Sequence, residues 1–341
     1  MTTPQTNPPD HRLCVAPMLD WTTGPCRFFH RRLSRRTRLY TEMVVAEALI
    51  RGDREKLLGH DPEERPLALQ IGGSDPRRLA EAARIGAEAG YDEINLNVGC
   101  PSDRVQSGTF GACLMRSPDL VAEGVAAMIR AVGGAAEITV KCRIGVDDQE
   151  PRDVLPDFIE RVSAAGCGVF IVHARKAWLK GLSPKENREI PPLDHELVHE
   201  VKAARPDLRI ILNGGVESLD VAEAHLARGL DGVMIGRAAW RDPVAVLASA
   251  DRRIYGEAVP DADPFAAAEA MRPYLAARLA EGWRLGALVR PMIGLFLGRP
   301  GARLWRQRLS EGAAKSGPGL ELFDEALAAM RAETLRAQDA A

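Results

Sequence analysis

The chain has 341 residues, of which 46% are hydrophobic and 27% are charged, and its formal net charge is −2. This composition is typical of a soluble protein with a hydrophobic core. The net charge by itself indicates nothing about nucleic-acid binding, for which local clusters of charge must be considered. The six cysteines include no C-x-x-C pair, and no signal peptide or membrane-length apolar run occurs, so we expect a cytoplasmic protein without structural zinc, disulfide scaffold or membrane span.

Short apolar runs recur along the first two thirds of the chain and predict strands. They cover Leu13–Met18, Leu39–Val44, Leu67–Ile71, Glu93–Val98, Ile138–Ile144, Val169–Val172, Arg209–Leu212 and Gly232–Ile235. Segments rich in Ala, Leu, Arg and Glu predict helices between them, at Pro76–Ala89, Pro118–Val132, Pro151–Ala165, Asp194–Ala204 and Ser218–Arg228. Eight such units predict an α/β fold, a parallel (β/α)8 TIM barrel. A doubly wound open sheet is the alternative, because periodicity does not show closure.

The strand pattern stops after about residue 256. Four further helices are predicted, at Pro264–Ala280, Leu285–Leu297, Gly301–Ser310 and Gly319–Ala337. We therefore expect a disordered N-terminus over residues 1–11, a barrel over 12–256 and a small all-helical C-terminal domain over 262–341.

Cys100 stands where the predicted strand Glu93–Val98 ends, between Gly99 and Pro101. Proline cannot donate to a sheet ladder, so the strand stops there and the loop holds the cysteine at the strand's carboxyl end. A thiol in that place can act as a nucleophile, a metal ligand or an acid. The alternative is a small buried hydrophobic residue, which free cysteine often is.

Other polar side chains gather where strands end, the edge of a barrel at which function is usually found. Lys141 and His173 lie on neighbouring strands. The lysine could be a Schiff-base nucleophile, or a fixed charge beside an electron-rich cofactor or oxyanion. With Gln70 and Asn213 the pair predicts a ring of donors around a flat polar ligand, for which flavin is the obvious candidate.

Glycines follow the last two predicted strands, in Asn213-Gly214-Gly215 and Gly236-Arg237. Glycine lets backbone N–H groups approach an anion, and these two loops are the usual phosphate site of such barrels. We therefore predict a phosphate site there, with two tight turns and a surface arginine as the alternative.

Arginine is concentrated in two stretches. The first contains Arg27, Arg31, Arg32, Arg35, Arg36 and Arg38. The second, Arg272–Arg308, has eight arginines against Glu281 alone, with Trp283 and Trp305 between them. This local excess predicts contact with a phosphate backbone, and the tryptophans could stack on bases. A solvated helix face is the alternative.

The motifs as a set resemble those of the tRNA-dihydrouridine synthases, in the order of that family and over about residues 13–310. They are Ala16-Pro17-Met18, Gln70-Ile71-Gly72-Gly73, Asn95-Leu96-Asn97-Val98-Gly99-Cys100-Pro101, Lys141-Cys142-Arg143-Ile144-Gly145, Val172-His173-Ala174-Arg175, Asn213-Gly214-Gly215 and Gly236-Arg237. The run from His173 to Arg188 further resembles the bacterial subfamily that acts on U20 and U20a of the D-loop.

The resemblance implies a flavoprotein oxidoreductase of tRNA processing, with bound FMN, NADPH as reductant and a helical tRNA-binding domain. It implies hydride transfer from reduced FMN to C6 of the uracil and proton transfer from Cys100 to C5. Asn97 and Arg143 would lie beside the flipped uracil, and Lys185, Arg188, Arg299 and Arg303 would contact tRNA. FMN would be held by Pro17, Met18, Gln70, Lys141, His173, Asn213, Gly214, Gly215, Gly236 and Arg237. We expect a monomer that uses no metal and no membrane.

Three other functions remain open from the residues alone. One is an FMN-dependent reductase of a free pyrimidine or a small ene substrate, which would have no use for the arginine-rich stretches. Another is a Schiff-base lyase that uses Lys141, against which bound FMN would count. The last is a non-enzymatic RNA-binding barrel, for which Cys100 would have no purpose.

Overall fold

A computed structural model of the chain describes residues 10–102, 110–313 and 319–339. Most of the N-terminus that we predicted to be disordered therefore lies outside the described residues. The described residues form two compact units. The first comprises the residues up to Leu19 together with Arg38–Val216 and Asp220–Gly236, and the second comprises Asp20–Thr37, Glu217–Leu219 and the residues from Arg237 onward.

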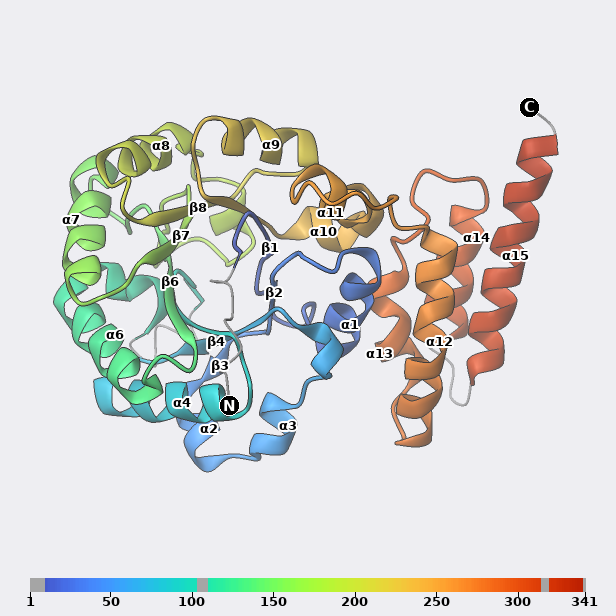
Figure 1. The fold of residues 1–341 in the computed structure, drawn as a ribbon, viewed down its shortest axis with the longest axis horizontal. Helices are drawn as coiled ribbons and strands as arrows, with labels where there is room; N and C mark the ends of the chain where they lie inside the picture. Colours follow the sequence, from blue (N-terminus) through green and yellow to red (C-terminus); the bar gives the residue numbers. More distant parts are fainter. Residues whose placement is uncertain (1–9, 103–109, 314–318, 340–341) are drawn as a thin grey trace. The chain divides into compact units, whose positions relative to one another are not determined.

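The strands lie in the first unit and form one parallel sheet in the order β1-β9-β8-β7-β6-β5-β4-β2, with β3 also paired to β4 (Figure 1). Their bounds are β1 Leu13–Val15, β2 Leu39–Tyr40, β3 Val44–Val45, β4 Leu67–Gly72, β5 Glu93–Val98, β6 Glu137–Arg143, β7 Val169–His173, β8 Arg209–Asn213 and β9 Gly232–Ile235. The single strand predicted over Leu39–Val44 is thus two short strands.

The sheet closes on itself between β1 and the residue before β2. Arg38 N donates to Leu13 O at 3.0 Å, and Val15 N donates to Arg38 O at 2.9 Å. Every neighbouring pair of strands is parallel, as in a (β/α)8 barrel. The barrel prediction is confirmed, and the open sheet is excluded.

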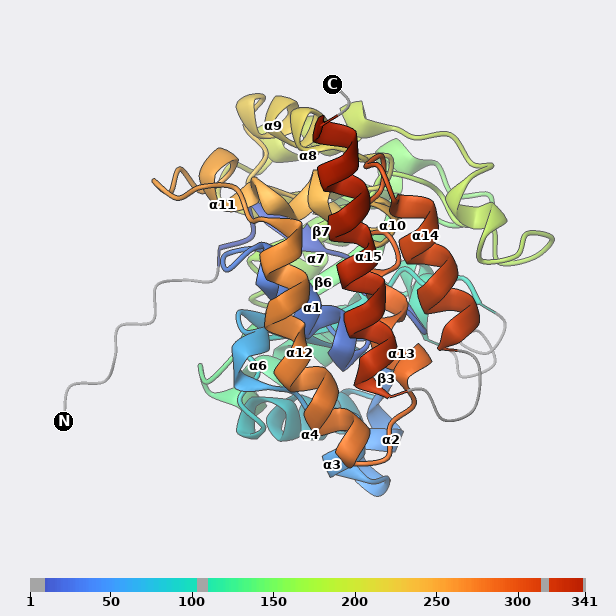
Figure 2. The same ribbon diagram turned by 90° about the vertical axis from the view of Figure 1, so that its right-hand side faces the viewer.

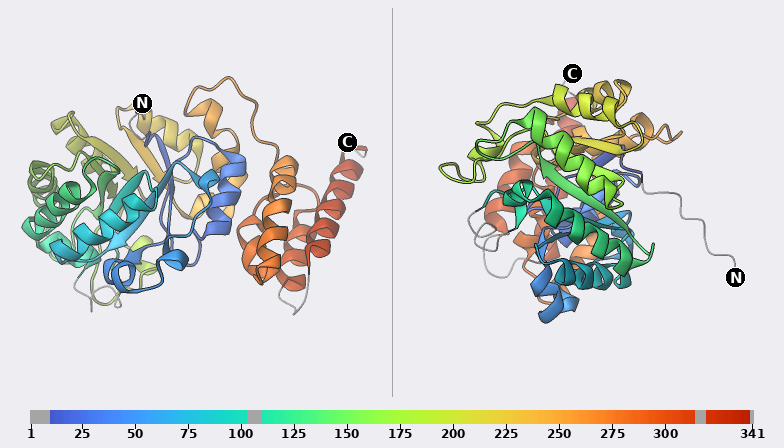
Figure 3. Two further views of the ribbon diagram at one scale, coloured as in Figure 1. Left: turned by 60° about the horizontal axis from the view of Figure 1, so that its bottom comes forward. Right: turned by 90° about the vertical axis from the view of Figure 1, so that its left-hand side faces the viewer.

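All five linking helices that we predicted are present. The helices of this unit are α2 Ala46–Arg51, α3 Arg54–Leu58, α4 Pro76–Glu88, α6 Pro118–Val132, α7 Pro151–Ala164, α8 His195–Ala204 and α9 Leu219–Ala227. They surround the strands (Figure 3). Local chemistry sets their ends: Asp75 caps α4 by accepting from Arg77 N and Arg78 N, and α6 stops at Gly133, whose φ is +57°.

The interior of the barrel is only partly apolar. One cluster consists of buried Cys14, Ala16, Tyr40, Ala68, Val169, Ile171, Ile211 and Met234. Gln70, Glu93, Asn95, Asn97 and Thr139 of β4, β5 and β6 are also buried. Buried polar groups cost free energy unless they are hydrogen-bonded, so their partners matter for the site described below.

Glu93 begins β5 and lies in a cluster of charged side chains at the amino-terminal end of the strands. Its carboxylate accepts from His11 Nε2 at 2.9 Å and lies 3.3 Å from Arg38 Nη1. Despite burial, these two neighbours lower the pKa of Glu93 to about 2. His11, Glu93 and Glu137 lie close enough together to hold a cation. Arg38 and Arg209 already neutralise the two carboxylates, so the cluster requires no ion.

The second unit is helical, and its helices α12 and α15 pack side by side (Figure 2). Its helices are α1 Gly24–Leu33, α10 Arg237–Arg241, α11 Ala250–Arg253, α12 Pro264–Ala280, α13 Leu285–Val289, α14 Ala302–Gln307 and α15 Leu320–Asp339. The helix predicted over Leu285–Leu297 ends early, in a 3-10 turn at Arg290–Met292, because Pro291 cannot donate a helical hydrogen bond. Helix α1 and residues 237–256 also belong to this unit, whereas we predicted them within a barrel domain over 12–256. Compact units are not the same as domains, so the predicted domain boundaries stay a prediction.

Trp305 lies in the core of the second unit. Its ring is fully buried, makes edge-to-face contacts with Phe296 and Phe323, and donates from Nε1 to Met292 O at 2.9 Å. The expectation that Trp305 stacks on bases is therefore wrong. Trp283 is 46% exposed, so its predicted stacking on bases stays a prediction.

Half of the first arginine stretch is buried. Arg27 donates to Thr22 O, and Arg31 donates to Ser34 O and Thr37 O, so both bind backbone within their own unit. Arg38 pairs with Glu93, as described above. The prediction that this stretch presents a surface for phosphates is thus wrong for these three side chains, because their hydrogen-bonding groups face the interior.

Candidate functional site

Cys100 lies in a turn that Asn97 holds. Asn97 Oδ1 accepts from Gly99 N at 3.0 Å and from Cys100 N at 2.9 Å. The thiol is partly exposed and lies 3.4 Å from Ser102 Oγ. By contrast, burial raises the pKa of the Cys142 and Cys167 thiols to about 12. Among these cysteines, the one at the end of β5 is the one suited to react with a molecule from outside.

Lys141 lies beside this turn, since its β6 position pairs with Asn97 of β5. Burial, and then the charge of Arg143, lower the pKa of Lys141 to about 8, while the Cys100 thiolate would act in the opposite direction. Its Nζ has no hydrogen-bond partner among the residues that the structure describes. An ammonium group held without a partner fits a site for an electron-rich ligand.

His173 ends β7 and opens onto the same rim. Burial and the nearby charges of Arg143 and Lys141 lower the pKa of its imidazole well below the ordinary value, so the ring is neutral at pH 7. Within the described part of the chain, no group hydrogen-bonds to the ring nitrogens. His173 and Lys141 thus place two unused donors on the same rim, and their contact with one ligand stays a prediction.

The loop after β8 requires its glycines. Gly214 has a φ of +98°, and a Cβ there would lie 2.5 Å from His173 Cδ2; Gly215 has a φ of +74°, and its Cβ would lie 2.5 Å from Leu193. Asn213 fixes the start of the loop by donating from Nδ2 to Met234 O at 2.8 Å. The bare backbone beside His173 fits the predicted phosphate site.

The ends of β1 and β9 lie next to each other. A Cβ built on Gly236 would lie 3.6 Å from Met18 Sδ, so these predicted cofactor residues share one part of the rim, and Pro17 precedes Met18 there. Arg237 begins α10 in the second unit, and its predicted contact with the cofactor stays a prediction.

Gln70 and Asn97 are linked inside the barrel. Gln70 Oε1 accepts from Asn97 Nδ2 at 2.8 Å, and Gln70 Nε2 donates to Asn95 Oδ1 at 2.8 Å. One N–H of the Gln70 amide remains unused by the described residues. The geometry therefore leaves Gln70 one donor for the predicted cofactor contact.

Arg143 joins the Cys100 turn to the segment after β7. Its guanidinium donates to Gly99 O at 3.2 Å, to Asn187 O at 2.9 Å and to Lys176 O at 3.3 Å. Burial lowers its pKa to about 9, which leaves it charged at pH 7. The predicted contact between Arg143 and the uracil is untested. What the structure adds is a backbone-holding role that the sequence did not reveal.

Asn187 shapes the segment that follows β7. Its amide accepts from Trp178 N at 2.7 Å and donates to Trp178 O at 2.9 Å and Leu182 O at 3.0 Å. Beside it, Lys185 and Arg188 are exposed. The charge of Arg188 lowers the pKa of both Lys141 and His173, so Arg188 lies near the rim. The role of Asn187 could not be predicted from the sequence, because an asparagine within a polar loop carries no periodic signal.

The second unit carries arginines without acidic partners. Arg272 pairs with Asp324, and Arg278 pairs with Glu281. No carboxylate of the described residues pairs with the exposed side chains of Arg284, Arg299, Arg303 and Arg306. The predicted tRNA contacts Arg299 and Arg303 belong to this free set, whose charge remains available for an anionic partner.

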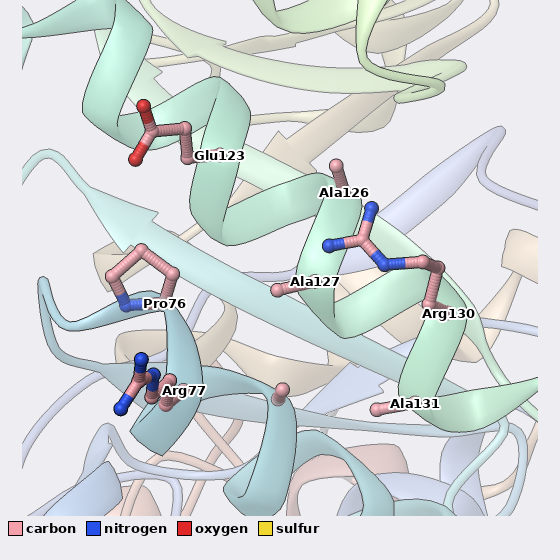
Figure 4. Close-up of a pocket in the computed structure, with 8 residues that line it drawn as sticks. Pro76, Arg77, Glu123, Ala126, Ala127, Arg130 and Ala131 are labelled. Carbon is pink, nitrogen blue, oxygen red and sulfur yellow. The ribbon is translucent and has the colours of Figure 1, made fainter.

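A groove lies elsewhere, between α4 and α6 (Figure 4). It has a volume of about 600 Å³ and is lined by alanines together with Pro76, Arg77, Glu123 and Arg130. It contains none of the predicted site residues, and Glu123 is the one carboxylate among its lining side chains. We therefore place the candidate site on the rim around Cys100.

Comparisons with known proteins agree with the motifs. The family described as "Dihydrouridine synthase (Dus)" matches residues 14–332. The chain is 54% identical to the tRNA-dihydrouridine(20/20a) synthase of Escherichia coli strain K12 over 317 residues, covering 93% of this chain and 90% of that protein. Identity to the protein of the same name from Vibrio cholerae serotype O1 is also 54%, covering 93% of this chain and 96% of that one.

A solved structure shares the fold at low sequence identity. It is that of the old yellow enzyme homologue from Zymomonas mobilis, with a TM-score of 0.50 and 14% identity, covering 74% of this chain and 90% of that one.

Proposed function

The chain belongs to the dihydrouridine synthase family, and we propose that it reduces the C5–C6 double bond of uridines 20 and 20a in the D-loop of tRNA, with bound FMN and with NADPH as reductant. The observation that carries the proposal is the meeting of Cys100, Lys141 and His173 on one rim of the barrel. We further propose a cytoplasmic monomer that uses no metal. No described helix is long and apolar enough to cross a membrane.

The residues of the rim fit FMN. Gly214 and Gly215 expose backbone for the phosphate. The other proposed contacts with FMN on this part of the site are Pro17, Met18, Gly236 and Arg237. The unpaired donors of Gln70, Lys141 and His173, with Asn213, suit the polar edge of the ring system. When bound, reduced FMN supplies a hydride to C6 of the uracil.

Cys100 is the proton donor in this proposal. Hydride addition at C6 leaves negative charge on C5 and O4, and the thiol proton moves to C5, leaving a thiolate. A thiol suits the step because it is a stronger acid than an alcohol. The partly exposed sulfur can regain its proton from water. Asn97 and Arg143 hold the turn so that the sulfur faces the uracil, which they also flank.

The target uridine is stacked within folded tRNA and must leave the stack to reach this rim. Contacts with the RNA backbone supply the binding free energy that offsets extrusion. Lys185 and Arg188 beside the rim, and Arg299 and Arg303 in the second unit, are the proposed contacts.

The free arginines of the second unit lead to one prediction. We expect the triple substitution Arg299→Ala, Arg303→Ala and Arg306→Ala to weaken tRNA binding about tenfold or more at physiological salt, because each arginine that neutralises a phosphate releases counterions. The slope of log Kd against log salt should fall by up to about three. Filter binding or fluorescence anisotropy with one tRNA over a salt series measures both quantities.

A matched triple in the same unit is the control. Arg252, Arg331 and Arg336 pair with Asp261, Glu269 and Glu333, so Arg252→Ala, Arg331→Ala and Arg336→Ala remove the same charge from arginines already in ion pairs. We expect a much smaller change in salt slope. Equal slopes for the two triples would contradict specific phosphate contacts.

The function itself is tested with the intact protein and two kinds of substrate, tRNA and free pyrimidines. We expect purified enzyme with FMN and NADPH to form dihydrouridine in unmodified tRNA, mapped by mass spectrometry to positions 20 and 20a, and to leave free uridine and uracil unreduced. Reduction of the free pyrimidine with no product in tRNA would instead favour the small-substrate reductase. Dihydrouridine at other positions would contradict the proposed target.

A further inference from the structure

A chain of hydrogen bonds runs through the barrel interior, from the Cys100 turn to the opposite end of β5. It crosses three strands and uses only buried side chains. Its links are Cys100 N to Asn97 Oδ1 at 2.9 Å, Asn97 Nδ2 to Gln70 Oε1 at 2.8 Å, Gln70 Nε2 to Asn95 Oδ1 at 2.8 Å, Asn95 Nδ2 to Thr139 Oγ1 at 2.7 Å, and Thr139 Oγ1 to Glu93 Oε1 at 2.5 Å.

The two ends of the chain fix its direction. At one end the backbone N–H of Cys100 can only donate, so Asn97 must present its oxygen there. At the other end Glu93 is ionised, because its pKa is about 2, and can only accept. Every amide between the ends therefore points its N–H₂ group toward Glu93. Hydrogen bonds that share one direction polarise one another and strengthen the chain.

Thr139 is the link on which this direction depends. Its hydroxyl accepts from Asn95 and donates to Glu93, which a valine of nearly the same shape cannot do. Without that acceptor, nothing at this end holds the Asn95 amide in one of its two orientations. A flip of Asn95 would place two N–H₂ groups opposite each other unless Gln70 and then Asn97 also flipped. The Cys100 turn would then lose its acceptor.

We propose that Thr139 and Glu93 are positioning residues, which act through this chain to fix the Gln70 amide and the Cys100 turn. The inference rests on the proposed function, since Gln70 and Cys100 are assigned there to the flavin and the uracil. It also explains why polar side chains occupy inward positions of β4, β5 and β6, where branched apolar residues usually fill a barrel. Neither Thr139 nor Glu93 lies at the rim.

The test substitutes Thr139→Val, with Thr139→Ser as the variant that restores the hydroxyl. Tyr40→Phe is the matched control, because Tyr40 OH also donates to Glu93 Oε1, at 2.7 Å, but is not a link of the chain. The first readout is the rate at which iodoacetamide modifies Cys100 in flavin-free protein, followed by peptide mass mapping. Cys113, which is also partly exposed, serves as an internal reference. The second readout is kcat and KM for tRNA.

For Thr139→Val we expect Cys100 to react about threefold faster or more relative to Cys113, since a lost hydrogen bond loosens the turn. We expect kcat to fall about tenfold or more with KM within about twofold, because the reacting groups are misplaced while RNA binding is unchanged. Thr139→Ser should restore both values. Tyr40→Phe should lower the melting temperature, yet leave the alkylation rate of Cys100 and kcat near their wild-type values.

The outcomes separate this inference from the proposed function. Alkylation of Cys100 needs neither flavin nor RNA. If the wild type forms no dihydrouridine, the proposed function is refuted, but alkylation still tests the chain of hydrogen bonds. If Thr139→Val and Tyr40→Phe alter Cys100 alkylation equally, or if serine fails to restore it, the positioning role is refuted. If the valine variant does not fold, Thr139→Ala removes the same hydroxyl and is measured in the same way.

Discussion

Replacing Cys100 with alanine is expected to lower the rate of dihydrouridine formation by about 10²- to 10⁴-fold, which is the range that a positioned general acid contributes. The variant should still bind FMN and appear yellow, because Cys100 lies in a turn held by backbone contacts and not among the cofactor donors. Turnover with tRNA and the absorbance of bound flavin measure the two properties separately.

Two further variants sharpen this prediction. Cys100→Ser should remain strongly impaired, since a hydroxyl is a much weaker acid than a thiol. Cys113→Ala is the matched control: Cys113 is also partly exposed, but its Sγ lies 3.1 Å from Phe110 O and has no role in the proposed reaction. Full activity of Cys100→Ala would mean that another group or water protonates C5.

Replacing Lys141 with methionine is expected to have opposite effects on cofactor binding and on stability. FMN should bind about 100-fold more weakly, because the site loses the ammonium that we propose contacts the cofactor. The flavin-free protein should become more stable at pH 7, since the charged amine is half-buried and has no partner among the residues that the structure describes. A pKa of about 8 instead of 10.5 corresponds to a cost of at most about 3 kcal/mol.

The sign of the pH dependence follows from the lowered pKa of Lys141. The cost is fully present below pH 8, where the amine is charged in the folded protein, and it disappears as the pH rises from 8 to 10.5. The difference in melting temperature between flavin-free wild type and Lys141→Met should therefore shrink over that range. Differential scanning fluorimetry at several pH values measures it, and FMN titration measures the loss of affinity.

Lys202→Met is a control for which we expect the opposite change in stability. Lys202 Nζ lies 2.7 Å from Asp231 and donates to Leu208 O at 2.8 Å, so its removal should destabilise the protein. A lower melting temperature for flavin-free Lys141→Met at pH 7 would show that the Lys141 ammonium has a stabilising partner.

Local patterns in the sequence were sufficient for the order of strands and helices. Helix α6 has the predicted bounds, because Pro118 starts it and Gly133 ends it within a few residues of chain. Cys100 could be placed after the end of β5 for the same reason, since Gly99 and Pro101 end the strand at the positions on either side of it. The inward-facing series Glu93, Asn95 and Asn97 could also have been recognised, because alternate residues of a strand share a face.

Partners distant in the chain could not be predicted in this way. Trp305 and Arg31 are of residue types that are common in nucleic-acid-binding surfaces, yet both side chains are buried in the fold. Arg143 reaches the carbonyl groups of Gly99 and Asn187, each 44 residues away in sequence. Nothing in the residues around Arg143 indicates those contacts.

The sequence alone determined the order of strands and helices and the place of Cys100 after β5, because periodicity, caps and breakers act over a few neighbouring residues. Closure of the sheet into a barrel was decided by the tertiary structure, in which Arg38 pairs with Leu13. Only the tertiary structure decided which arginines remain free, what holds the Cys100 turn, and how Thr139 connects Glu93 to Asn95. Burial and hydrogen-bond direction depend on groups that the folded backbone brings together across strands, and no local pattern records which groups those are.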